Sequence, residues 1–261
     1  MFYIDKLFAF IQPIAIASFL GTMIVIFKSL KFSQILLKIL FGFVLAIFLI
    51  SISATFVINT PIFYSFEFNK NNITEITQIP PDELMRASQQ IREYFTNDEQ
   101  YLNLEVYQNG VLRSIYSEKE ISHMKDVKFL IKGVYSLATI SLTIILITAT
   151  WGIVLNPHQF IPTLVKLLAS SAKYILITAL ILSVLCLLAF QKLFLIFHQI
   201  SFANDLWILD PSKDYLIIMF PQNFFLEATL FIGVLILIEC LILILLPKLT
   251  KSKAAQLLKS N

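Results

Sequence analysis

Charged side chains are scarce in this sequence: they make up 14% of its 261 residues, whereas a typical soluble domain carries about 25%. Hydrophobic residues make up 57% of the chain, so water cannot be its main solvent. The net charge of +3 is small, which excludes the concentrated basic surface of a nucleic-acid-binding protein. The composition is that of a membrane protein.

Cysteine is also scarce, and the two cysteines, Cys186 and Cys240, both lie in long apolar stretches. The polar segments offer no cysteine to pair with, which excludes a disulfide framework and a cysteine-ligated metal site. Burial in an apolar helix suppresses the thiolate, so we expect both residues to serve packing. The sequence has no internal repeat either, which argues against a transporter built from inverted halves.

Long apolar runs are what the sequence has in excess. A helix needs about 20 apolar residues to cross the hydrocarbon core of a bilayer. Five stretches meet this length, namely 7–27, 36–58, 129–154, 173–197 and 224–247. The first carries Asp5 and Lys6 at its head and no small-residue cleavage site after it, which favours a retained helix over a signal peptide.

Lysines predict the orientation of these spans. Three short segments, between spans one and two, between spans three and four, and after span five, contain lysine and no acidic residue: Lys28, Lys31, Lys38, Lys166, Lys173, Lys248, Lys251, Lys253 and Lys259. The positive-inside rule places these segments in the cytoplasm. We therefore expect an α-helical integral membrane protein of about five transmembrane helices, N-out and C-in.

The predicted spans divide the chain into three parts. Residues 1–58 form two N-terminal transmembrane helices, and 59–128 form a small extracytoplasmic α+β domain. Residues 129–261 hold three transmembrane helices, an outward loop at 198–223 and a basic cytoplasmic tail.

The outward domain carries three local signals. Proline and two acids at its start predict a helix over 81–95. Asn109-Gly110 between two alternating apolar runs predicts a β-hairpin. Ser117 and Glu120 have the spacing of a capping box, so a further helix should start near Ser117 and continue into the third span.

The predicted topology places two of the three histidines at one membrane face. His123 stands above span three and His198 at the end of span four, both at the outer interface, whereas His158 is cytoplasmic. Imidazole suits proton transfer near neutral pH, so we hypothesise that the outer two share a site. Glu120 and Asp126 lie three residues on either side of His123 and are candidates for orienting it.

Each candidate also has a purely structural interpretation. A lone interfacial histidine is often only an amphipathic anchor, and that is our interpretation of His158. Glu239 lies inside span five, where a carboxyl is either functional or a protonated packing residue, and we prefer packing. Two histidines with distant acids do not make a zinc site, which needs three or four ligands.

Two segments around the outer histidines carry a family resemblance. The first is Glu120-Ile121-Ser122-His123-Met124-Lys125-Asp126-Val127-Lys128; the second runs from Phe197-His198-Gln199 to Asn204-Asp205-Leu206-Trp207, with Asp214 to Pro221 and Phe224-Phe225 beyond it. From about Phe41 to Leu246 the chain resembles the bacterial lipoprotein intramolecular transacylase family. It departs at Ser201, where an aromatic residue is expected, and in its first span, an addition to the usual four.

The resemblance implies an acyltransferase of the bacterial cell membrane, active at the outer face. Such enzymes move an acyl chain from the diacylglyceryl group of a lipoprotein's N-terminal cysteine to that cysteine's α-amine, leaving a lyso-form lipoprotein. The family's functional histidines fall on His123 and His198, and supporting roles are expected for Glu120, Asp126, Asn204, Asp205 and Trp207. The expected partners are the diacylated lipoprotein and the bilayer, with no cofactor or metal; the oligomeric state is not predicted.

Such a transfer needs acid–base help, since an α-amine of pKa about 7.7–8.0 must lose a proton before it attacks an ester. We hypothesise that one histidine deprotonates the amine while the other stabilises the oxyanion or protonates the departing glycerol oxygen. An acyl-enzyme at Ser122 or Ser201 is a less favoured route. The alternatives are a non-enzymatic membrane protein with a partner-binding or sensing domain, and a hydrolase of ordinary lipid.

Overall fold

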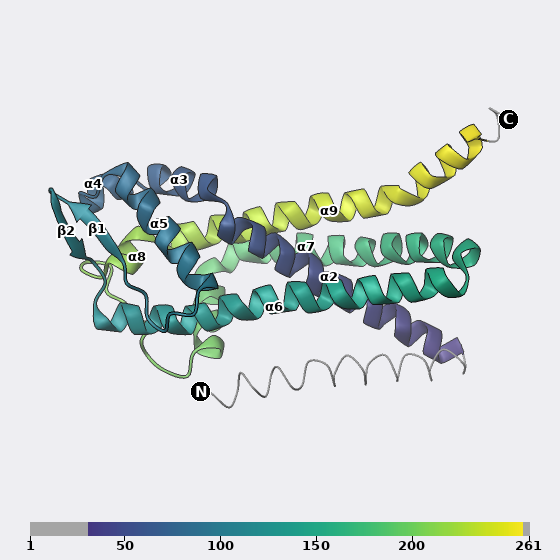
Figure 1. Cartoon of the computed structure of the whole chain (residues 1–261), viewed down its shortest axis with the longest axis horizontal. Coiled ribbons are helices and arrows are strands. Elements are labelled where there is room, and N and C mark those ends of the chain that lie inside the picture. Colours follow the sequence, from purple (N-terminus) through teal and green to yellow (C-terminus); the bar gives the residue numbers. More distant parts are fainter. Residues whose placement is uncertain (1–30, 258–261) are drawn as a thin grey trace. The chain divides into compact units, whose positions relative to one another are not determined.

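The computed structural model describes residues 31–257, so the predicted span 7–27 lies outside the described residues (Figure 1). Within them, four helices are long and apolar enough to cross a membrane. These are α2 (Lys31–Asn59), α6 (Glu118–Leu155), α7 (Pro157–Ser201) and α9 (Gln222–Leu257). Each contains one of the other four predicted spans, while the total number of spans and their orientation stay predictions.

Helix α6 is longer than a membrane is thick. Its 38 residues extend about 57 Å, whereas the hydrocarbon core measures about 30 Å. The surplus lies at its start, because charged residues crowd 118–128 and the apolar segment begins at Phe129. His123 therefore stands outside the apolar segment of α6.

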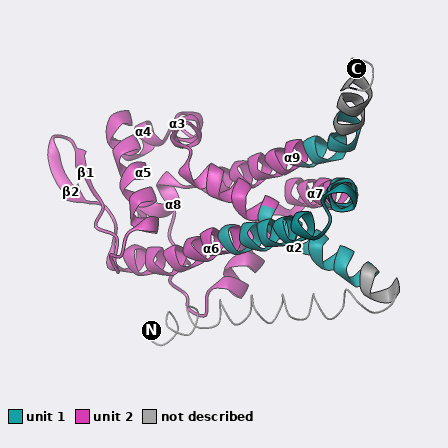
Figure 2. Ribbon diagram, turned by 45° about the vertical axis from the view of Figure 1, so that its right-hand side comes forward, with its two compact units in different colours: residues 1–48, 139–175, 240–261 teal, residues 49–138, 176–239 magenta. Residues whose placement is uncertain are grey.

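The chain forms two compact units (Figure 2). One takes its described residues from 1–48, 139–175 and 240–261, and the other comprises 49–138 and 176–239. All of the outward domain predicted at 59–128 and the loop predicted at 198–223 belong to the second unit.

In the first unit, α6 and α7 are separated by the single residue Asn156. Gly152 makes this tight turn possible, since a Cβ there would lie 2.2 Å from the Phe160 ring. Pro157 is the first residue of α7. A backbone N–H at this position has no partner within the helix, so proline removes no helical hydrogen bond.

In the second unit, five short elements connect α2 to α6. They are α3 (Pro61–Lys70), α4 (Ile73–Thr77), α5 (Pro81–Thr96), β1 (Glu105–Gln108) and β2 (Val111–Ser114). The predicted helix at 81–95 is thus confirmed as α5, and the predicted hairpin as β1 and β2. Two helices, α3 and α4, were not predicted, and α8 (Tyr215–Met219) lies in the loop between α7 and α9.

The hairpin turn has the geometry its sequence predicts. Strands β1 and β2 pair antiparallel with Gln108 opposite Val111, so the turn is the two residues between them. Asn109 has φ 53° and Gly110 φ 76°. Positive φ at both positions is the type I′ turn that Asn-Gly favours.

One hydrophobic core holds the second unit together. Most of its buried residues lie in 59–128, and α2, the end of α8 and the start of α9 supply the rest: Val57, Phe63, Tyr64, Phe68, Ile73, Ile79, Leu84, Ala87, Ile91, Tyr94, Phe95, Leu102, Leu104, Val106, Ile115, Tyr116, Met124, Met219, Phe220 and Phe224. Met124 belongs to this core and follows His123 directly in α6. The core therefore fixes the helical turn that carries His123.

The capping box predicted at Ser117 is confirmed and does more than start α6. The Ser117 N–H donates to Glu120 Oε2 at 2.7 Å, and the Glu120 N–H donates to Ser117 Oγ at 3.4 Å. The second oxygen, Oε1, accepts the Leu216 N–H of α8 at 2.7 Å. One buried carboxylate thus caps α6 and anchors the loop between α7 and α9 to it.

Candidate active site

The second unit brings His123 and His198 together. His123 lies in the second turn of α6 and His198 in the last turn of α7, 75 positions later in the chain. Their ring centroids are 6.3 Å apart with an interplanar angle of 32°. Both side chains are buried, with 6% and 9% of their surface exposed. Two imidazoles in this arrangement can act on one small group between or beside them.

A backbone carbonyl fixes the tautomer of His198. Its Nδ1 lies 2.7 Å from the carbonyl oxygen of Phe194. A carbonyl oxygen only accepts hydrogen bonds, so Nδ1 carries the proton and the neutral ring has its free lone pair on Nε2. His198 is thereby prepared to accept a proton at Nε2.

His123 has a different environment. Its buried Nδ1 has no hydrogen-bond partner within residues 31–257. Burial, and after it the neighbouring His198, lowers the pKa of His123 to about 4. The ring is therefore neutral at neutral pH and can donate one N–H without bringing a charge into the site.

Aromatic rings enclose both histidines. Phe202 packs edge-on to His123 at 5.0 Å and lies 5.6 Å from His198. Phe194 lies 4.3 Å and Trp207 5.1 Å from the His198 ring. Trp207 was predicted as a supporting residue; the two phenylalanines were not, although their positions four residues before and after His198 could have indicated them.

Helix α7 departs from regular geometry before it reaches the site. Ala189 has φ −138° and ψ 24°, which are not helical values. The turns that follow carry Phe194, Phe197 and His198. The direction of this last part of α7 is therefore set separately from the rest of the helix, and it determines where His198 points.

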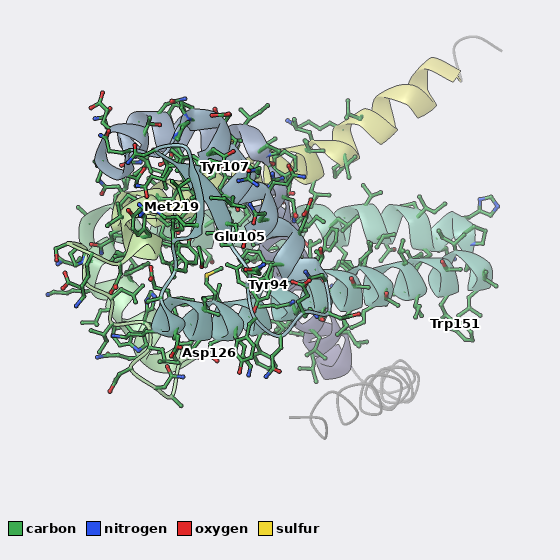
Figure 3. The ribbon with its side chains drawn as sticks, turned by 60° about the vertical axis from the view of Figure 1, so that its left-hand side comes forward. Tyr94, Glu105, Tyr107, Asp126, Trp151 and Met219 are labelled. Carbon is green, nitrogen blue, oxygen red and sulfur yellow. The ribbon has the colours of Figure 1, made fainter. Side chains whose placement is uncertain are left out.

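The remaining predicted supporting residues are placed as follows. The side-chain amide of Asn204 donates from Nδ2 to Asp126 Oδ2 at 2.9 Å. This hydrogen bond joins the loop after α7 to α6, and Asp126 is labelled in Figure 3. The Glu120 carboxylate is occupied by Ser117 and Leu216. Asp205 is exposed, and its carbonyl accepts the Ile208 N–H. A role for Glu120, Asp126 or Asp205 in orienting an imidazole stays a prediction.

Two other candidates lie elsewhere. His158 is exposed in the first turn of α7. Glu239 accepts a hydrogen bond from Ser53 Oγ at 3.2 Å, a link between α9 and α2 that fits the packing interpretation. Within residues 31–257, no cluster of three or more His, Cys, Asp or Glu side chains could hold a metal ion.

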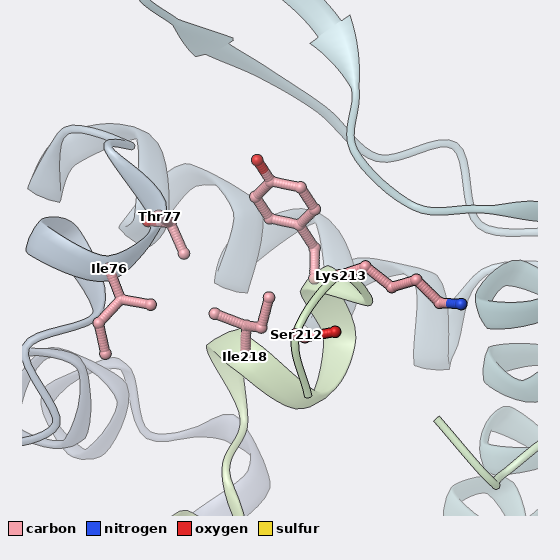
Figure 4. Close-up of a pocket in the computed structure, with 6 residues that line it drawn as sticks. Ile76, Thr77, Ser212, Lys213 and Ile218 are labelled. Carbon is pink, nitrogen blue, oxygen red and sulfur yellow. The ribbon is translucent and has the colours of Figure 1, made fainter. Parts of the chain in front are cut away.

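A shallow hollow in the second unit is separate from the histidines. It is lined by Ile76, Thr77, Ser212, Lys213, Tyr215 and Ile218 (Figure 4). These residues come from α4, α8 and the turn before α8. Neither His123 nor His198 is among them.

A comparison with protein families decides what this site belongs to. Residues 39–225 match the model of the family described as lipoprotein intramolecular transacylase Lit. The chain belongs to this family. The matched range covers most of the chain, including both histidines, and confirms the resemblance carried by the two segments around them. A member of the Lit family is an acyltransferase, so the alternative of a non-enzymatic membrane protein is wrong.

Solved structures show the same fold. The chain is similar to the membrane-integral Lit of Bacillus cereus, with 21% sequence identity and a TM-score of 0.70 over 87% of this chain and 100% of that one. Two further structures of the Bacillus cereus protein carry a single histidine substitution, to arginine and to alanine, and match with TM-scores of 0.69 and 0.67. They cover 90% and 85% of this chain, again at 21% identity. No curated protein sequence matches the chain.

Proposed function

We propose that this Lit family member moves an acyl chain from the diacylglyceryl group of a bacterial lipoprotein to the α-amine of the same N-terminal cysteine, with His123 and His198 as its acid–base pair. The single observation that carries this proposal is the 6.3 Å separation of two buried imidazoles, one of which has a defined tautomer. The product is a lyso-form lipoprotein with an amide at its N-terminus and a free glycerol hydroxyl.

The tautomer of His198 favours it as the base. The neutral amine attacks the ester carbonyl carbon, and Nε2 of His198 takes the proton that the nitrogen loses. His123 donates an N–H to the oxyanion of the tetrahedral intermediate. When the C–O bond of the ester breaks, the proton held by His198 passes to the glycerol oxygen, so that atoms and charge balance.

Much of the rate acceleration in this proposal comes from positioning. The amine and the ester belong to one molecule, so the enzyme has only to hold them in a reactive conformation. The rings of Phe194, Phe202 and Trp207 support the proposal, because they restrict both imidazoles and exclude water that would hydrolyse the ester instead.

The proposed setting is a bacterial cell membrane with the site at its outer face. The lysines of the three short connecting segments support this orientation. The diacylated lipoprotein and the bilayer are then the partners, and the reaction as written needs no cofactor.

The test is fragmentation mass spectrometry of an N-terminal lipopeptide after incubation of a diacylated lipoprotein in vesicles with the protein. Transfer conserves mass, so the fragments must locate the acyl chains. We expect N-acylation with the wild type, and a loss of at least about 100-fold in rate for His123→Ala and His198→Ala. The exposed His158→Ala is the matched control and should keep full activity. Release of free fatty acid without N-acylation would instead favour a lipid hydrolase.

A further inference from the structure

The two edges of the β-hairpin differ sharply. Strand β1 lies on the α5 side of the hairpin (Figure 1), and side chains of α5 cap its outer edge. Gln90 accepts from the Glu105 N–H at 3.2 Å and donates to the Glu105 carbonyl at 3.0 Å. Glu83 accepts from the Tyr107 N–H at 2.7 Å. No further strand can add to β1.

The outer edge of β2 is open. Gln108 and Val111 face each other next to the two-residue turn and exchange both of their backbone hydrogen bonds. Pairing alternates along an antiparallel ladder, so the N–H and C=O groups of Leu112 and Ser114 point away from β1. Within residues 31–257 these outward groups have no hydrogen-bond partner, and all four residues of β2 are exposed.

The side chains on this edge do not protect it. Natural edge strands are usually blocked by proline, by a bulge or by several charges. Strand β2 has none of these apart from Arg113, while Val111 and Leu112 keep 62% and 43% of their surface exposed. An exposed, regular strand edge with apolar side chains is the surface to which an extended peptide can add.

We propose that the free edge of β2 binds the extended peptide that follows the lipidated cysteine of the lipoprotein substrate. This inference rests on the proposed function, because only a protein substrate brings such a peptide to the site. Strand addition relies on main-chain hydrogen bonds, so one edge can accept lipoproteins of different sequence.

The chain itself limits the distance from this edge to the histidines. Three residues lie between Ser114 and Glu118, the first residue of α6, so these two positions are at most four extended steps, or about 14 Å, apart. His123 lies five residues further along the helix, a rise of about 7.5 Å. A peptide that starts at the histidines therefore reaches β2 within about seven extended residues.

The test compares lipopeptides that share one lipidated cysteine and differ in the peptide after it. We expect kcat/KM to be roughly tenfold higher with ten residues than with two, as for the gain of one or two main-chain hydrogen bonds. Methylating alternate backbone nitrogens of the longer peptide should remove this gain in the wild-type enzyme. That arm needs no enzyme variant, so it does not depend on a variant's folding.

The enzyme variant is Leu112→Pro, which removes one outward N–H but no hydrogen bond of the hairpin. It should convert the ten-residue lipopeptide as slowly as the two-residue one and leave the latter unchanged. Leu112→Ala is the matched control, because it keeps the N–H and should keep most of the length dependence.

The outcomes separate the two proposals. Conversion of both lipopeptides at equal kcat/KM would overturn strand addition and leave the transfer reaction standing. A Leu112→Pro variant that dissociates a dimer but keeps the length dependence would assign the edge to a second copy of the chain, and would also overturn it. Failure to convert any lipopeptide would contradict the proposed function itself.

Discussion

Two buried polar side chains, one helical turn apart on α6, have opposite surroundings. The Glu120 carboxylate accepts hydrogen bonds from the Ser117 N–H, the Ser117 hydroxyl and the Leu216 N–H. Nδ1 of His123 has no partner within the described part of the chain. Burying a polar group without a partner costs folding free energy. A buried polar side chain that lacks a hydrogen-bond partner despite this cost is a candidate for a functional role. One whose hydrogen bonds are all made stabilises the fold.

The two histidines also differ from Glu120 in what surrounds them. Nδ1 of His198 has a hydrogen-bond partner, whereas Nε2, the nitrogen that would take a proton, has none within residues 31–257. Aromatic rings surround the pair, and they hold it in place by shape without occupying its lone pairs. The region around Glu120 is built from hydrogen bonds, and the region around the histidines is built from ring packing.

Removing each of the two side chains in turn should affect the stability of the protein very differently. Glu120→Ala leaves buried donors at Ser117 and Leu216 unpaired, so we expect the free energy of unfolding to fall by about 3 kcal/mol. His123→Asn should change the free energy of unfolding by less than about 1 kcal/mol. Within the described residues, Nδ1 of His123 makes no hydrogen bond that the substitution could remove. Thermal unfolding in detergent measures both.

The exposed Glu118→Ala is the control for Glu120→Ala, since it removes an acid from the same helical turn without breaking a buried network. If His123→Asn destabilised the protein as much as Glu120→Ala, His123 would be a structural residue and the distinction between the two regions would fail.

The sequence predicts the local structure well and the partners of side chains poorly. The lengths of the apolar stretches predicted α2, α6, α7 and α9, because a helix needs about 20 apolar residues to cross a bilayer. The hairpin and the start of α6 depend on neighbouring residues, Asn109-Gly110 and Ser117 with Glu120, and were predicted for that reason.

Contacts between distant segments could not be predicted from apolar length or from neighbouring residues. Glu120 was predicted to orient His123, but spacing along a helix does not reveal that Leu216, 96 residues later, donates to its carboxylate. The kink at Ala189 has no proline or glycine to indicate it. The meeting of His123 and His198 was predictable only because a membrane restricts two interfacial residues to one plane.

A second buried carboxyl makes the stability of the protein depend on pH. Glu67 of α3 is fully buried, and its pKa is raised from 4.5 to about 7 by burial and then by Glu227 of α9 beside it. Lys70 and Asn71 act in the opposite direction, and Lys70 also pairs with Glu227. Two carboxyls can share a hydrogen bond only while one keeps its proton.

Because the folded state holds this proton more tightly than the unfolded chain, stability is lost as pH rises from about 4.5 to about 7. Glu67→Gln cannot ionise, so at pH 8 it should melt about 2–4 °C above the wild type and at pH 4.5 at nearly the same temperature. The exposed Glu75→Gln should leave the whole pH profile unchanged. An E67Q profile parallel to the wild type would mean that folding does not raise the pKa of Glu67.

The smallest effect is expected where the two regions meet, at the hydrogen bond from Asn204 to Asp126. Both residues are at or near the surface, so Asn204→Ala should cost no more than about 0.5–1 kcal/mol of stability. The bond holds the loop that carries Trp207 against α6, and Trp207 packs on His198. We therefore expect a twofold to fivefold fall in transfer rate with an unchanged melting temperature, measured beside the neighbouring exposed Ala203→Ser. A fall matched by Ala203→Ser would show that any change in this loop slows the reaction, and a rate equal to the wild type would remove Asn204 from the residues that position His198.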